Sequence, residues 1–167
     1  GQGNVTIATA LQSIANDING VFASYLRVEI YPQDTANVPA GNHYTAALAQ
    51  NRVIDLCEGS SSGASSGEAS LKMAGKKITG CTISYGDSAH DSLKRYLNLI
   101  AHELGHCLNL THPQEVDDAI MSYYSDDSII RYELDDKLGI RYLYPANVAG
   151  VDHKESSTFG LGCDFKK

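Results

Sequence analysis

The stretch HELGHCLNLTH, residues 102–112, holds three histidines and one glutamate. Its first seven residues belong to a pattern of apolar residues at helical spacing that runs from about Asp91 to Leu108. At about 100° per residue, His102 and His106 fall together on the polar side of this helix, one turn apart. Histidines packed into a core would lie on the apolar side, whereas two imidazoles one turn apart on a polar face can bind one metal ion.

The residues after the helical pattern bring a third histidine within reach of the same ion. His112 stands six residues after His106, so the helix must end and the chain must turn sharply between them. Asn109 stands where this turn is needed, and Asn is the residue that most often replaces Gly in the left-handed backbone conformation. Pro113 prevents the helix from resuming. A site with three histidine ligands is therefore predicted.

This eleven-residue motif resembles the elongated zinc-binding motif of the metzincin peptidases, with Asn109 where the clan usually has Gly. Two later stretches agree with the resemblance. AIMSY, residues 119–123, is similar to the Met-turn, and a Tyr two residues after the Met is the astacin and serralysin pattern. LDDKLGIRYLY, residues 134–144, is similar to the C-terminal helix of the matrixins. The resemblance by motif covers about Leu93 to Tyr144.

The resemblance implies a fold and a set of ligands. It implies an α+β class, the metzincin-like zincin fold: a twisted mixed β-sheet, an active-site helix, a Met-turn and a C-terminal helix. One catalytic Zn²⁺ would be bound by His102, His106 and His112. Histidines of the matrixin structural-zinc pattern are not recognisable in residues 58–90, so a second zinc is not expected.

The implied activity is that of a secreted endopeptidase acting on protein or peptide substrates. Glu103 lies about 100° around the helix from His102 and about 60° from His106, so it can approach a zinc-bound water without binding the ion. It is expected to be the general base that takes a proton from this water and delivers it to the leaving amine. The resemblance adds Tyr123 as a fifth ligand that swings to stabilise the oxyanion; the alternative is an ordinary core tyrosine.

Two other functions are compatible with the motif. The first is a zinc-bearing binding or inhibitory module that is catalytically silent, against which the intact Glu103 argues. The second is a structural zinc site, which three histidines disfavour because structural sites usually have four protein ligands. The Met-turn resemblance implies that Met121 lies beneath the zinc site as an apolar floor, and the alternative is an ordinary core methionine; in both cases Met121 is expected to be buried.

Composition is consistent with a single catalytic domain over residues 1–167. Hydrophobic residues make up 43% and charged residues 20% of the 167 residues, near the averages of globular proteins. The net charge of −7 disfavours nucleic-acid and membrane-surface partners. No run of eighteen apolar residues occurs and the chain opens without Met, so a targeting segment or propeptide is expected to have been removed. We expect a monomer.

Four cysteines in a small domain favour two disulfides and an oxidising compartment, which predicts secretion. Cys57 is expected to pair with Cys81, because both lie in strand-like segments that flank one loop, and Cys107 with Cys163. The alternatives are buried free thiols in a cytosolic protein and a Cys163 thiolate that blocks the zinc.

The rest of the chain is expected to supply the scaffold. Apolar spacing predicts a helix over residues 7–18 and strands over residues 26–31, 52–57 and 77–85. Residues 59–70 contain almost no side chain that could pack into a core, which predicts a flexible surface loop. The clan resemblance places an edge strand at about Ala69 to Ala74, where extended substrate would pair with it, and a pocket wall at about Tyr123 to Arg131.

The remaining ionisable residues carry weaker expectations. The acidic pairs Asp117-Asp118 and Asp126-Asp127 suit Ca²⁺, but without an oxygen-rich loop such pairs are usually solvated turns, so calcium is not predicted. Asp126 and Asp127 would favour basic substrate side chains if they face the pocket. The other histidines, His43, His90 and His153, lack ligand spacing and are expected at the surface.

Overall fold

A computed structural model of the chain describes residues 7–31, 44–48, 52–58, 67–75, 77–86, 92–113, 115–124 and 126–146. Within these residues three helices and five strands form an α+β structure, as expected. In chain order they are α1 (Ile7–Asn19), β1 (Val28–Tyr31), β2 (Tyr44–Leu48), β3 (Arg52–Glu58), β4 (Gly67–Ala74), β5 (Lys77–Tyr85), α2 (Leu93–Cys107) and α3 (Leu134–Leu143).

The five strands form one mixed sheet in the order β1-β2-β3-β5-β4. Strands β3 and β5 pair in parallel, with Ile54 opposite Cys81, and the other pairs are antiparallel. The expected helix and the three expected strands are confirmed as α1, β1, β3 and β5, although β1 begins at Val28 instead of Leu26. Strand β2 was not predicted, because its sequence YTAAL has no clear alternation of apolar and polar residues.

Strand β4 lies at the edge of the sheet, where the substrate-binding strand was expected. It begins at Gly67, so the prediction of a loop over residues 59–70 is wrong for its last four residues. Pairing with β5 explains this difference, since the register runs from Gly67 opposite Tyr85 to Ala74 opposite Lys77 and does not require apolar side chains at every position. Residues 59–66 of the predicted loop lie outside the described residues.

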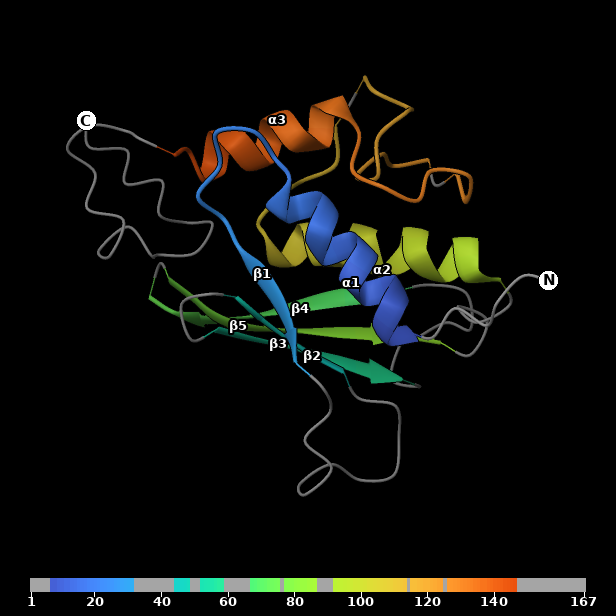
Figure 1. Cartoon of the computed structure of the whole chain (residues 1–167). Helices are drawn as coiled ribbons and strands as arrows, with labels where there is room; N and C mark the ends of the chain where they lie inside the picture. Colours follow the sequence, from blue (N-terminus) through green and yellow to red (C-terminus); the bar gives the residue numbers. More distant parts are fainter. Residues whose placement is uncertain are drawn as a thin grey trace.

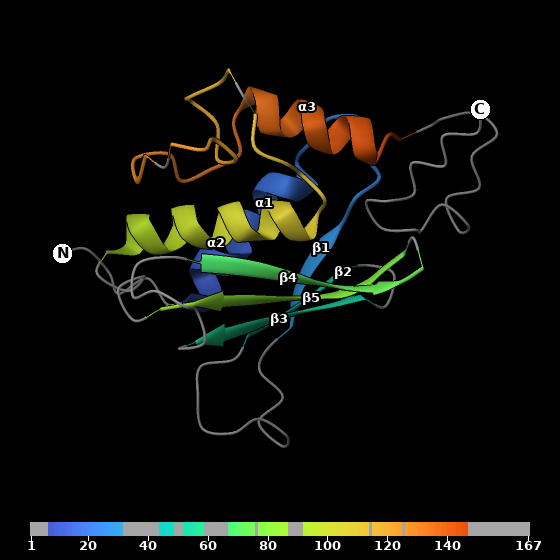
Figure 2. The ribbon, with the colours of Figure 1, turned by 180° about the vertical axis from the view of Figure 1, so that it is seen from behind.

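Helices α1 and α2 cover one face of the sheet, and α3 lies beyond them on the side away from the strands (Figures 1 and 2). The core is formed where these layers meet. Its buried side chains include Ile14 and Ile18 of α1, Ile78 and Ile83 of β5, and Ile100 and Leu104 of α2. The spacing predicts Leu93 on the apolar face of α2, but it is the first residue of the helix and is 42% exposed.

The disulfide of the described residues joins Cys81 to Cys107, with the Cα atoms 5.7 Å apart. The predicted pairs, Cys57 with Cys81 and Cys107 with Cys163, are therefore wrong. Both bonded residues are buried in the interface between β5 and α2, where the core face of the helix meets the sheet. Cys81 lies on the apolar face of β5 and Cys107 on the apolar face of α2, and these two faces pack together. The positions of the cysteines along the chain do not reveal this contact.

Within the described ranges, no helix combines the length and the apolar character needed to cross a membrane.

Candidate active site

Helix α2 presents His102 and His106 away from its core-facing side, as their spacing predicts. Ser92 caps its start, since the backbone N–H of Arg95 donates to the Ser92 hydroxyl at 3.1 Å. Tyr96, Ile100 and the other apolar positions that follow Leu93 pack inward, while the side chains of His102 and His106 are only partly buried. The two histidines thus lie off the core-facing stripe and are available to a ligand.

The turn after α2 brings His112 back towards the helix. Asn109 has φ of 64°, the left-handed conformation expected of it. The N–H of Leu110 donates to the carbonyl of Gly105 at 2.9 Å, and the N–H of Asn109 donates to the carbonyl of His106 at 2.8 Å. These two bonds make a Schellman C-cap, which ends the helix and reverses the chain within two residues.

The three imidazoles converge on one point through their Nε2 atoms. The Nε2 of His112 lies 3.0 Å from that of His102 and 3.1 Å from that of His106. The Nδ1 of His102 is 2.7 Å from the carbonyl oxygen of Ile120, and the Nδ1 of His106 is 2.9 Å from that of Leu110. Because a carbonyl oxygen can only accept, each of these Nδ1 atoms carries the hydrogen and leaves the Nε2 lone pair for a metal.

This donor set fits a zinc ion. The ligand atoms of His102, His106 and His112 all lie within 4.8 Å of one another, and among the described residues they are the group of three that could hold a metal. Three imidazole nitrogens without a fourth protein ligand are typical of catalytic zinc sites, which keep one position open for water or substrate.

Burial lowers the pKa of His102, and the neighbouring His106 and His112 lower it further. The hydrogen bond to the carbonyl of Ile120 acts in the opposite direction. Burial also lowers the pKa of His112, with His106 as the second cause. A histidine must be neutral to bind a metal, so these shifts favour the ligand form at neutral pH.

Glu103 lies beside the triad with its side chain buried, 7% exposed. Burial raises the pKa of Glu103 to about 7; a hydrogen bond from the backbone of Ala69 opposes this shift, and the charge of Glu68 adds to it. A carboxyl group whose pKa is close to neutrality can both take and release a proton at physiological pH.

Met121 is buried, as expected, and is 2% exposed. It packs directly against Gly105 on α2, where an added Cβ would overlap the Met121 Sδ atom. The glycine within the motif thus allows the turn that contains Met121 to approach the helix between the two motif histidines.

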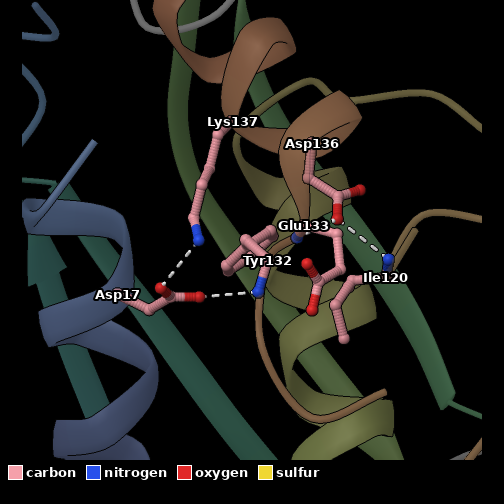
Figure 3. Close-up of polar contacts among 6 residues, drawn as sticks. All are labelled: Asp17, Ile120, Tyr132, Glu133, Asp136 and Lys137. Carbon is pink, nitrogen blue, oxygen red and sulfur yellow. Dashed lines mark hydrogen bonds and ion pairs between the residues drawn. The ribbon is translucent and has the colours of Figure 1, made fainter. Parts of the chain in front are cut away.

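Asp136 at the start of α3 holds the backbone of this turn, a role that the sequence did not reveal. Its buried carboxylate accepts from the N–H groups of Ile120 at 2.9 Å, Met121 at 3.0 Å and Glu133 at 2.8 Å. Figure 3 shows Asp136 directed at Ile120, whose carbonyl in turn orients His102. Glu133 and Asp136 form a capping box, with acidic residues at the spacing typical of a helix start. This spacing indicates where α3 begins, but it does not indicate that Asp136 binds the turn at Met121.

A second acidic residue ties α1 to the same region. Asp17 accepts from the N–H of Tyr132 at 2.6 Å and pairs with Lys137 of α3 at 3.3 Å (Figure 3). The hydroxyl of Tyr132, itself fully buried, donates to the carbonyl of Ala101 on α2 at 2.6 Å. Three helices therefore meet at the segment before α3.

A cavity of about 870 Å³ lies in front of the triad and contains Glu103 in its lining. Gly67 to Ala69 of β4 line it, as do residues of α2 and of the segment around Tyr123. Asp126 and Asp127 also line it, so the pocket wall expected at about residues 123–131 contributes to the cavity. Hydrogen bonds at Ser128 lower the pKa of Asp126.

Tyr123 is 76% exposed, so the alternative of a core tyrosine is wrong. Its ring lies 4.9 Å from that of His112, centroid to centroid. Asn98 of α2 fixes the next part of the wall, since its amide donates to the carbonyls of Asp126 at 3.1 Å and Ile129 at 2.8 Å. This contact explains why Asn98 is buried although it lies on the polar side of the helix.

The remaining candidates lie apart from this site. Asp117 and Asp118 are exposed and do not line the cavity. His43, His90, His153 and Cys163 lie outside the described residues, and nothing in the structure tests the expectations for them.

Comparison with known proteins agrees with this geometry. Residues 15–145 match the matrixin family of peptidases. A segment of 58 residues is 40% identical to matrix metalloproteinase-B of Caenorhabditis elegans, covering 33% of this chain and 11% of the nematode protein. The chain thus spans a small part of that relative's length, and no solved structure gives a significant match. Because the match covers most of the chain and includes the whole histidine triad, the chain belongs to the matrixin family, with a zinc site formed by His102, His106 and His112.

Proposed function

We propose that this chain is the catalytic domain of a secreted zinc endopeptidase and cleaves internal bonds of protein or peptide substrates. One observation carries the proposal: three Nε2 atoms converge beside a buried carboxyl group in the wall of one cavity. A zinc ion held by His102, His106 and His112 would act as a Lewis acid: it would polarise the scissile carbonyl and lower the pKa of a bound water molecule.

Glu103 is the general base. It takes the proton of the attacking water and delivers it to the nitrogen of the leaving amine. Its raised pKa, about 7, suits both steps, because the group is partly ionised at neutral pH and gives the proton up readily. Burial beside the triad keeps the carboxyl group close to where the water would stand.

Tyr123 stabilises the negative charge that develops on the carbonyl oxygen. Its phenol projects into the cavity wall next to His112 and is exposed enough to change position when substrate binds. A donor aimed at a developing oxyanion lowers the barrier by about 2.7–4 kcal/mol in well-characterised hydrolases.

The scaffold proposal is a metzincin-type domain over residues 1–167 that acts as a monomer. Family membership and the order of the sheet, α2, the Met121 turn and α3 support it. Extended substrate would lie along the free edge of β4 and pair with its backbone. The disulfide supports an oxidising compartment and hence secretion.

The test is hydrolysis of a quenched-fluorescent peptide library by protein of measured zinc content, with and without a chelator. We expect cleavage that chelation abolishes and zinc restores. Glu103→Ala is expected to keep one equivalent of zinc and to lose activity by about a hundredfold to ten-thousandfold, the usual contribution of a general base. One equivalent of zinc without any cleavage by the unchanged chain would instead indicate a silent zinc-bearing module.

A further inference from the structure

Glu103 is in contact with strand β4, which lies outside the motif that contains it. A Cβ atom added to Gly67, the first residue of β4, would lie 2.7 Å from the Cγ of Glu103, 2.9 Å from its Oε1 and 3.1 Å from its Cδ. Carbon atoms do not approach one another this closely without repulsion. Any side chain at position 67 would therefore displace the carboxyl group of Glu103.

Gly67 is needed for this space and not for an unusual backbone. Among the described glycines the positive φ belongs to Gly75, at 62°, in the turn directly after β4. The backbone of Gly67 is thus in a region that other residues also adopt. The cost of a larger residue at position 67 arises from the side chain it would meet, and that side chain is Glu103.

A second contact from the same strand acts on the carboxylate itself. The backbone of Ala69 hydrogen-bonds to Glu103, and since a carboxylate only accepts, the N–H of Ala69 is the donor. Gly67 and Ala69 are two residues apart on one strand, and both line the cavity. Gly67 leaves the space that the side chain of Glu103 occupies, and the N–H of Ala69 holds its carboxylate.

We propose that the first residues of β4 position the general base: Gly67 through the space it leaves and Ala69 through its N–H. The inference rests on the proposed role of Glu103. It means that the edge strand which would bind substrate also sets where the catalytic carboxyl group stands. Gly67 is a positioning residue, because it acts through Glu103 and not on substrate.

The first test compares two glycine variants in the zinc-loaded full chain, one at the first residue of β4 and one directly after its last residue. Gly67→Ala is expected to lower kcat by about tenfold to a hundredfold, the effect of moving a catalytic group by about 1 Å, with KM little changed and one equivalent of zinc retained. Gly75→Ala is the matched control. It strains the backbone at a positive φ but has nothing within 4 Å of the new Cβ, so it should lower stability and leave kcat unchanged.

The second test is a double-mutant cycle read by thermal unfolding, which needs no activity. Gly67→Ala should lower Tm when Glu103 is present, and it should lower Tm much less in the Glu103→Ala background, because that change removes the atoms that the new Cβ would meet. If Gly67→Ala has the same effect on Tm in both backgrounds, the two residues are not coupled and the proposal is wrong.

The two tests separate this inference from the proposed function. Loss of coupling in the cycle, or a kcat of Gly67→Ala equal to that of the unchanged chain, overturns the positioning role alone. An active Glu103→Ala variant overturns the role of Glu103 as base, whatever the cycle shows.

Discussion

The charge of Glu103 depends strongly on its surroundings. The same burial that raises its pKa to about 7 makes it useful as a base and costs the folded state stability when the group ionises. Its position between α2 and β4 therefore links catalysis to a measurable pH dependence of the metal-free protein.

We predict that the contribution of Glu103 to the stability of the metal-free chain falls as pH rises from about 4.5 to about 7. Its pKa rises from 4.5 to about 7 on folding, so in this window the folded chain binds more protons than the unfolded chain. Stability from this source is complete below pH 4.5 and is lost as pH rises through 7. Urea unfolding with a chelator should show a steeper fall for the unchanged chain than for Glu103→Gln. Equal slopes would contradict the raised pKa.

Tyr123 gives a second prediction at this scale. Removing its hydroxyl in Tyr123→Phe should lower kcat by about a hundredfold, as loss of an oxyanion donor does, without loss of zinc, since the three histidines remain. Steady-state kinetics and metal analysis check it. Tyr124→Phe is the matched control, because Tyr124 is equally exposed at 76% and does not line the cavity. Equal kcat values for the two variants would remove Tyr123 from the mechanism.

At the scale of elements, α2 depends on contacts at both of its ends. Ser92 caps its first turn, and the Schellman bonds at Asn109 close its last turn. The disulfide then anchors this last turn to β5 through Cys107, the residue that follows His106. The position of the second zinc ligand therefore depends on a covalent bond to the sheet.

We predict that replacing both bonded cysteines, in Cys81→Ala/Cys107→Ala, lowers the free energy of unfolding by about 3 kcal/mol. The bond closes a loop with a sequence separation of 26, and its loss frees the unfolded chain. Urea unfolding of the oxidised protein measures the change. Peptide mapping without reduction is the check on the pairing: a fragment that joins residues 57 and 81 instead would show that the assignment is wrong.

At the scale of the whole molecule, polar contacts join parts of the chain that are far apart in sequence. Asp17 of α1 pairs with Lys137 of α3, and the carboxylate of Asp136 accepts from the N–H of Ile120 (Figure 3). Asp136 also accepts from the N–H of Met121, and the carbonyl of Ile120 orients His102. Residues of α1, of α3 and of the turn at Met121, none of which belongs to the motif, thus support the zinc ligands.

Asp136→Asn tests this support. Three backbone N–H groups donate to the two carboxylate oxygens of Asp136. The amide of Asn has one accepting oxygen, so at least one of these buried donors loses its partner. We expect a loss of about 1–3 kcal/mol in stability and a tenfold to hundredfold weaker affinity for zinc. Zinc titration with a competing chelator measures the second effect.

The control for that substitution is Asp135→Asn. It makes the same change of charge at the neighbouring position, where the side chain is exposed. Unaltered zinc affinity in Asp136→Asn, or an equal loss in both variants, would show that the buried hydrogen bonds do not support the site.

The sequence by itself determined the local parts of the site. Helical spacing identified α2 and placed His102 and His106 off its core-facing stripe, and Asn109 followed by Pro113 predicted the turn that returns His112. These features depend on residues within one turn or one helix, where backbone geometry relates sequence spacing directly to position in space.

Only the tertiary structure decided the contacts between elements. The pairing of Cys81 with Cys107, the extra strand β2, the carboxylate of Asp136 under the Met121 turn and the approach of Gly67 to Glu103 all join segments that are distant along the chain. Spacing within a segment does not fix which faces meet or in what register, because packing and strand pairing of the whole chain set both.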